Sequence, residues 1–296
     1  VAGMKASAFS YARASSVVDA LQLLARHGDQ TKVLSGGQSL MPALNLRLSA
    51  PDLLVDIGAL TELRGVGVTD GVLRIGALTR HVDVLRSADI AKHAPLLTEA
   101  IAHVAHPAIR NKGTFGGSLA HADPASELPA CVIALDAEIL ARSADGERRV
   151  KAADFFTGIY ETVLTPEELL IAIEIPVAKP NTVHFFHEYA RRKGDYAIVG
   201  LAASGTREGD VLTDLRLGYF AVGEKATLVK ASKVLVGRPV TATVLAEAQG
   251  ALDSELDPQE DQQATVEMRR YLARQLMAQC VSKLLGRPDL ETRALA

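Results

Sequence analysis

Two glycine-rich segments contain the residue types best suited to binding chemistry in this sequence. Residues 35–39 read SGGQS and follow a short apolar run, and residues 113–118 read GTFGGS. Adjacent glycines let backbone N–H groups converge on a phosphate without obstruction by side chains. The serine and threonine hydroxyls beside them can add further donors. One such segment often marks a simple turn, but two in one chain favour a phosphorylated ligand.

Other motifs with a defined chemistry are missing from the sequence. Residues 65–71 (GVGVTDG) have three residues before the last glycine and precede a predicted strand, so they indicate a hairpin turn, not a dinucleotide loop. No P-loop, G-x-S-x-G or H-E-x-x-H sequence occurs. His103 and His106 have helical spacing, but no suitable third ligand follows, so no metal site is predicted. These absences leave no catalytic acid, base or nucleophile evident in the sequence.

The composition is that of a folded globular protein of two or three packed units. Its 296 residues are 48% hydrophobic and 23% charged. The net charge of −3 argues against nucleic acid as the main partner, since phosphate backbones require a concentrated positive field. Cys131 and Cys280 lie in apolar surroundings and are predicted to be buried, reduced thiols. Two cysteines are also too few for an iron–sulfur cluster, which takes four ligands.

The sequence gives no sign of membrane insertion or secretion. No apolar run reaches the roughly 18 residues of a membrane-spanning helix. The first residues, VAGMKASAFS, lack the apolar stretch and cleavage site of a secretory signal. The expected location is the cytoplasm.

Hydrophobic periodicity and turn residues predict an α+β protein in three successive parts. Residues 1–57 combine a helix with short buried strands, and residues 58–177 are mainly antiparallel strands with helices. Pro176 and Pro180 mark the next boundary, since neither fits a continuous helix or a central strand. Residues 178–296 begin with three predicted strands and end with a long helix that Gly286 and Pro288 terminate.

Four segments together resemble one known family. They are SGGQSLMPALNLRL (35–48), IGALTRH (75–81), IRNKGTFGGSLAHADPASELP (109–129) and RRKGDYAIVG (191–200). In this order they are similar to the FAD-binding medium subunit of the molybdenum hydroxylases, such as aerobic carbon monoxide dehydrogenase and the flavin segment of xanthine dehydrogenase. The resemblance implies a two-subdomain FAD-binding fold of the vanillyl-alcohol-oxidase/PCMH type. A C-terminal domain with a three-stranded antiparallel sheet and helices would follow it.

The resemblance also implies roles for individual residues. The two glycine segments would hold the FAD pyrophosphate through Ser35, Gly36, Gly37, Gln38, Ser39, Thr114, Gly116, Gly117 and Ser118. The family's ribose-binding aspartate corresponds to Glu127, which is one methylene longer, so Asp123 is the alternative. Tyr196 would cover one face of the isoalloxazine ring, the alternative being a core tyrosine that begins a strand.

A role in electron transfer follows from the same resemblance. A small partner subunit would hold two [2Fe–2S] clusters, and a large partner subunit would hold the molybdenum cofactor and select the substrate. The non-covalently bound FAD would pass electrons from the clusters to a terminal acceptor, in a complex expected to be a dimer of heterotrimers. Two alternatives remain open: a stand-alone flavin reductase of the same fold, and a non-enzymatic scaffold that has lost FAD.

Overall fold

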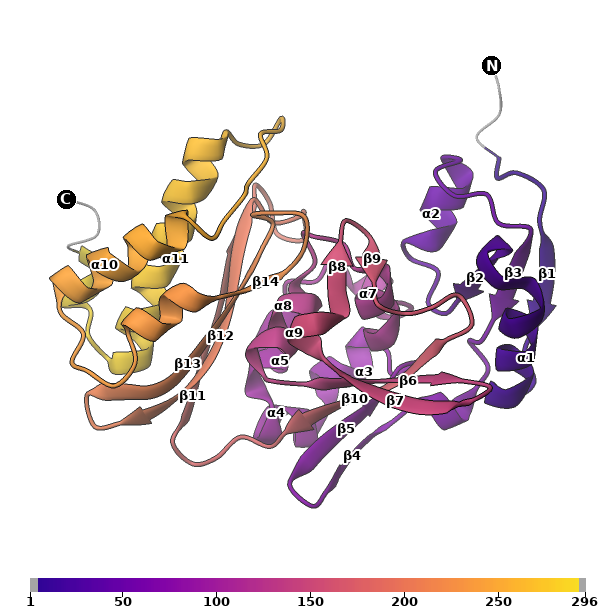
Figure 1. The fold of residues 1–296 in the computed structure, drawn as a ribbon, viewed down its shortest axis with the longest axis horizontal. Helices are drawn as coiled ribbons and strands as arrows, with labels where there is room; N and C mark the ends of the chain where they lie inside the picture. Colours follow the sequence, from indigo (N-terminus) through magenta and orange to yellow (C-terminus); the bar gives the residue numbers. More distant parts are fainter. Residues whose placement is uncertain (1–4, 293–296) are drawn as a thin grey trace.

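The computed structural model describes residues 5–292 and contains three main sheets (Figure 1). The first is a parallel sheet of order β1-β3-β2, formed by β1 (Ser10–Arg13), β2 (Thr31–Leu34) and β3 (Leu53–Asp56). Helix α1 (Val17–His27) packs on it, with Ser16 as N-cap and Gly28 at φ +52° as C-cap. A serine cap and a terminal glycine are the expected helix boundaries. Helix α2 (Leu40–Asn45) follows β2.

The second sheet is antiparallel throughout, as predicted for the middle of the chain. Its order is β4-β5-β10-β6-β7, with strands β4 (Val66–Thr69), β5 (Val72–Gly76), β6 (Glu138–Ser143), β7 (Gly146–Lys151) and β10 (Leu169–Pro176). Asp70 and Gly71 form the β4–β5 turn, so residues 65–71 are part of a hairpin.

The middle region also contains a series of short helices. They are α3 (His81–Arg86), α4 (Ala88–His93), α5 (Pro95–Ile101), α6 (Pro107–Arg110), α7 (Phe115–His121), α8 (Glu127–Ala134) and α9 (Ala152–Phe155). A two-stranded hairpin of β8 (Phe156–Gly158) and β9 (Glu161–Thr162) follows α9. Short 3-10 turns occur at Gly28–Gln30, Thr61–Leu63 and Lys230–Val234.

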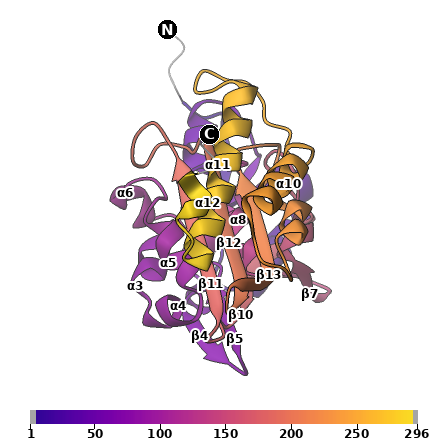
Figure 2. The same ribbon diagram turned by 90° about the vertical axis from the view of Figure 1, so that its left-hand side faces the viewer.

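The C-terminal sheet has four strands where three were predicted. It consists of β11 (Thr182–Tyr189), β12 (Val199–Glu208), β13 (Val211–Phe220) and β14 (Thr227–Val229), all antiparallel. Strand β14 has only three residues, too few to show an alternating pattern in the sequence. Helices α5 and α8 cover one face of this sheet, and α10 (Ala242–Asp253), α11 (Val266–Leu285) and α12 (Asp289–Thr292) lie on the other side (Figures 1 and 2).

One hydrophobic core joins the middle region to the C-terminal sheet. Leu73 and Ile75 of β5, Leu128 of α8 and Phe186 and Phe220 of the C-terminal sheet belong to one cluster of buried side chains. The observed α+β architecture agrees with the sequence-based prediction. The two cysteines are free and fully buried, as predicted, and burial raises the pKa of the Cys280 thiol above its usual range.

Helix α8 approaches strand β13 so closely that a side chain at Gly218 would not fit. A Cβ atom there would lie 2.5 Å from the Ala130 carbonyl oxygen. We therefore expect Gly218→Ala to lower the free energy of unfolding by about 1–3 kcal/mol, because the helix backbone must move. Urea denaturation measures this change. Gly250→Ala in α10, where a Cβ meets nothing within 4 Å, serves as the control and should stabilise by about 0.5–1 kcal/mol; equal effects would contradict the proposed packing.

Candidate functional site

The first glycine segment leaves a row of backbone donors unused. Residues 35–39 connect β2 to α2, and Gly37 has φ +71°, a conformation that favours glycine. Gln38 donates from its side-chain amide to the Gly36 carbonyl oxygen at 3.0 Å. Within residues 5–292, the N–H groups of Gly36, Gly37, Gln38 and Ser39 have no hydrogen-bond acceptor. Four consecutive free N–H groups can serve an anionic ligand.

The second glycine segment is not the open loop that the sequence predicted. Thr114 caps α7, and Phe115, Gly116 and Gly117 form its first turn. Their N–H groups donate to the Thr79 carbonyl, the Ala77 carbonyl and the Thr114 hydroxyl, at 2.9, 2.9 and 3.1 Å. These amides are thus already satisfied within the chain, unlike those of the first segment.

The glycines of the second segment permit close packing. A Cβ on Gly116 would lie 2.6 Å from the Ala77 Cβ, so only glycine lets α7 rest on the end of β5. A Cβ on Gly117 would lie 2.7 Å from the Ser35 hydroxyl oxygen. The Thr114 hydroxyl is used between the Gly117 N–H and Ser35, so the Ser118 hydroxyl is the donor that this segment can still offer a ligand.

The structure brings the two segments into direct contact. A Cβ on Gly36 would overlap the Lys112 carbonyl oxygen and lie 2.8 Å from the Gly113 Cα. The Thr114 hydroxyl donates to the Ser35 hydroxyl at 3.2 Å. Segments that are about 80 residues apart in the sequence therefore form one site, with the free N–H groups on one side of it.

His81 supports this site and was not among the residues that the sequence singled out. Its backbone N–H donates to the Gly113 carbonyl at 3.0 Å, and its Nε2 lies 3.0 Å from the Thr114 carbonyl and 3.1 Å from the Ser118 hydroxyl. Burial lowers the pKa of His81 to about 4, so the ring is neutral at pH 7. A carbonyl partner requires that Nε2 carries the proton. In the sequence His81 ends the segment IGALTRH (75–81), one of the four that carry the family resemblance, but no role was assigned to it there.

Asp123 and Glu127 lie at the opposite end of α7 from Thr114. Ala122 ends the helix in the left-handed region, and buried Asp123 accepts a 2.9 Å hydrogen bond from the Ala125 N–H. Glu127 begins α8, where burial first, and then the carboxylates of Glu188 and Asp123, raise its pKa to about 8. Both candidate carboxyl groups are thus in one place, and Glu127 holds a proton at pH 7.

Tyr196 is on the surface and is not a core residue. Its side chain is 62% exposed on the loop between β11 and β12. Burial of the phenol and the nearby Asp123, Tyr160 and Glu127 raise the pKa of Tyr196. The tyrosine therefore lies beside the two carboxyl groups. Tyr160, which the sequence analysis did not consider, lies there too.

Comparison with known proteins fits this arrangement. Residues 7–178 match the family described as FAD binding domain in molybdopterin dehydrogenase, and residues 184–284 match the CO dehydrogenase flavoprotein C-terminal domain. The chain belongs to the FAD-binding subunits of the molybdenum hydroxylases. This flavoprotein subunit is accordingly part of an oxidoreductase.

Its similarity to relatives extends over nearly the whole chain. The subunit is 38% identical to the 6-hydroxypseudooxynicotine dehydrogenase complex subunit alpha of Paenarthrobacter nicotinovorans, over 96% of this chain and 97% of that protein. It matches carbon monoxide dehydrogenase from Hydrogenophaga pseudoflava with a TM-score of 0.93 at 31% identity, covering 95% and 99% of the two chains. Quinoline 2-oxidoreductase from Pseudomonas putida 86 gives a TM-score of 0.88 at 37% identity, covering 96% and 99%.

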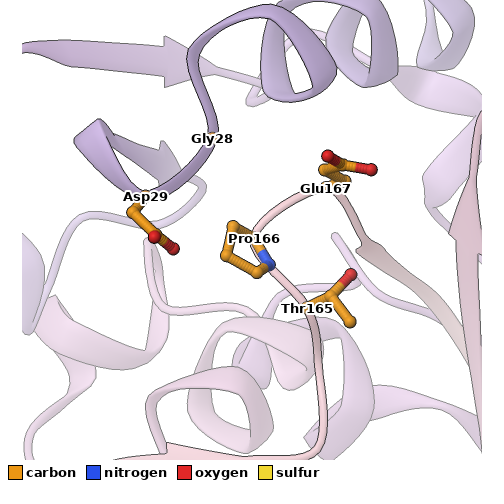
Figure 3. Close-up of a pocket in the computed structure, with 5 residues that line it drawn as sticks. All are labelled: Gly28, Asp29, Thr165, Pro166 and Glu167. Carbon is orange, nitrogen blue, oxygen red and sulfur yellow. The ribbon is translucent and has the colours of Figure 1, made fainter.

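Other parts of the flavoprotein subunit offer less chemistry. A shallow hollow at the end of α1 is lined by Gly28, Asp29, Thr165, Pro166 and Glu167, none of them a predicted site residue (Figure 3). Residues 5–292 contain no group of three or more His, Cys, Asp or Glu side chains placed to hold a metal. None of the helices described is long and apolar enough to span a bilayer.

The buried neutral histidine predicts an acid-dependent loss of stability. Between pH 6.5 and about 4 the unfolded chain binds a proton at residue 81 that the folded chain does not, so stability falls as the pH falls. The loss amounts to roughly 3 kcal/mol when complete. Glutamine does not titrate, so His81→Gln lacks this pH-dependent loss. In urea titrations, the difference in the free energy of unfolding between the unmodified protein and His81→Gln should therefore shrink as the pH falls from 6.5 to about 4. A constant difference would contradict the neutral, buried state.

Glu127 predicts the opposite trend with pH. Because its pKa is raised to about 8 in the folded chain, the folded state binds the extra proton between pH 4.5 and 8, and stability falls as the pH rises. At pH 8 we expect the free energy of unfolding of Glu127→Gln to exceed that of the unmodified subunit by about 1–3 kcal/mol. This is less than the full pKa shift would give, because the side chain is half-buried and solvent weakens the effect. Thermal unfolding at pH 5 and pH 8 tests this, with exposed Glu167→Gln as the control. A gain that does not grow with pH would refute the assignment.

Proposed function

We propose that this subunit binds one FAD non-covalently at the joined glycine segments and passes electrons through it. The observation that carries the proposal is the row of free N–H groups at residues 36–39. This row begins at Gly36, whose backbone is in contact with the backbone of Lys112 and Gly113. These N–H groups would hold the diphosphate, with the hydroxyls of Ser35 and Ser118 as additional donors and the Thr114 hydroxyl holding Ser35 in place. When bound, the flavin supplies reversible one- and two-electron chemistry.

The shape of the site is consistent with a diphosphate. Backbone comes close to backbone at Gly36, and any side chain at Gly36 or Gly117 would fill the space between the segments. His81 holds the second segment from behind, through the Gly113 and Thr114 carbonyls. The subunit's own residues thus fix the position of the ligand and leave the donors uncovered.

The carboxyl groups and tyrosine at the far end of α7 would hold another part of the same ligand. Asp123 and Glu127 are the candidates for the ribose hydroxyls. A protonated Glu127 could donate a hydrogen bond to a ribose oxygen, where the shorter aspartate of the family would accept one. Tyr196, exposed and held near them, would cover a face of the isoalloxazine ring.

A complex with two further subunits is the proposed setting. Several relatives are named as subunits or medium chains, including the Paenarthrobacter complex subunit alpha. Both cysteines here are fully buried, so [2Fe–2S] clusters would come from a small partner subunit. A large subunit with the molybdenum cofactor would choose the substrate, whether carbon monoxide, an aldehyde or an N-heterocycle. The assembly would be a dimer of heterotrimers.

A single methyl group tests the diphosphate site. Gly36→Ala places a Cβ against the Lys112 carbonyl and should separate the two segments, so we expect the purified protein to lose its flavin absorbance and to bind FAD at least about tenfold more weakly. Titration calorimetry and visible absorbance measure this. Gly250→Ala adds the same methyl group in open space and should stay yellow. A Gly36→Ala variant that keeps full FAD affinity would refute the site.

The electron path is tested in the assembled complex. On mixing with the complex's reducing substrate, the flavin should bleach after the iron–sulfur absorbance changes, and the isolated subunit should not be reduced by that substrate at all. Stopped-flow spectroscopy resolves the order. Direct reduction of the isolated subunit by a nicotinamide nucleotide would instead favour a stand-alone reductase.

A further inference from the structure

We propose that Tyr160 is a second ring-binding residue of the FAD site, acting with Tyr196 on an aromatic ring of the dinucleotide. The inference rests on the proposed function and adds to it a residue from a separate hairpin. It is drawn from the backbone conformation of Tyr160, from its contacts at the end of α7 and from the exposure of both phenols.

The two-residue turn from β8 to β9 places Tyr160 in a backbone conformation that favours glycine. Tyr160 is the second of two residues that connect β8 to β9, between the paired Gly158 and Glu161. It has φ +55°, a conformation in which glycine would be less strained than a tyrosine. Strain of this kind is concentrated where a particular side chain is needed. Tyr160 is 56% exposed.

The contacts of Tyr160 fix its phenol and leave ring surface free. The phenol donates to Asp123 Oδ2 at 3.5 Å, and the backbone N–H donates to the Ala122 carbonyl at 3.3 Å. The ring lies 4.9 Å from the His121 ring, at an angle of 37°. Both phenol and backbone are therefore attached to the C-terminal end of α7.

The position along α7 suits a dinucleotide. Helix α7 has seven residues and is therefore about 10 Å long, with the Thr114 cap and the free amides at one end and Asp123 with Tyr160 at the other. That separation is of the order of the distance from the diphosphate to either ring of FAD. A ligand held by the amides would thus extend its ring toward Tyr160.

Tyr196 approaches the same carboxylate from another element. Its loop is anchored by Gly194, where φ is +87° and a Cβ would lie 2.6 Å from the His106 ring, and by Arg191, which donates to the Gln262 carbonyl at 2.9 Å. Asp123 and Tyr160 both raise the pKa of the Tyr196 phenol. Two exposed tyrosines near one carboxylate are suited to pack against a planar ring.

The test compares affinity with stability in the full-length subunit stripped of FAD. Tyr160→Gly removes the ring and relieves the strain, so we expect unchanged or higher thermal stability of the FAD-free protein together with FAD binding about tenfold weaker or more. Tyr160→Phe keeps the ring and should bind FAD within about threefold of the unmodified protein. Asp70→Gly relieves a similar positive φ, +49°, in the distant β4–β5 turn and should leave FAD affinity unchanged.

Fragment binding then distinguishes the two rings of FAD. If Tyr160 contacts the flavin, the Tyr160→Gly protein binds FMN more weakly but ADP normally, and its bound FAD is more fluorescent. If Tyr160 contacts adenine, ADP binding falls and flavin fluorescence stays the same. Unchanged FAD affinity in Tyr160→Gly, or a loss of thermal stability that accompanies the loss of affinity, would overturn the inference. Failure of the unmodified subunit to bind FAD would instead refute the proposed function.

Discussion

The backbone of Gly36 lies directly against the backbone of Lys112 and Gly113, and the candidate site depends on this contact. It joins the end of a strand in the parallel sheet to the turn that opens α7 beside the antiparallel sheet. Because no side chain separates the two segments, the hydroxyls of Ser35 and Thr114 are close enough to bond. The free amides on one segment are thus held at a fixed distance from the hydroxyls on the other.

The two glycine segments differ in whether their backbone amides are free to bind a ligand. In residues 35–39 the amides are unused, so their glycines leave donors open. In residues 114–118 the amides are bonded to Ala77, Thr79 and Thr114, so their glycines serve contact between helix and strand. The two segments therefore have similar composition but different physical roles. His81, neutral and buried, holds the backbone of the second segment in place.

The sequence predicted well what depends on neighbouring residues. The limits of α1 follow from Ser16 and Gly28, the turn at Asp70 follows from its glycine neighbour, and the glycine pairs mark two segments that the structure brings into contact. It failed where partners are distant in the chain. Which amides are free depends on carbonyls about 40 residues away, in the turn after β5, and the burial of His81 depends on packing that no local pattern records. Tyr160 was missed because a positive φ at a tyrosine leaves no trace in the sequence.

The core shared by the middle region and the C-terminal sheet has a consequence for how the molecule melts. Phe186 and Phe220 are buried in the same cluster as Leu73 and Leu97, so neither side can lose its packing while the other keeps it. The middle region and the C-terminal sheet should therefore denature in a single cooperative transition, with calorimetric and van't Hoff enthalpies in agreement. The three-stranded parallel sheet shares a second cluster with Leu140 of β6 and with Leu169 and Ile171 of β10, so its packing depends on the antiparallel sheet in the same way.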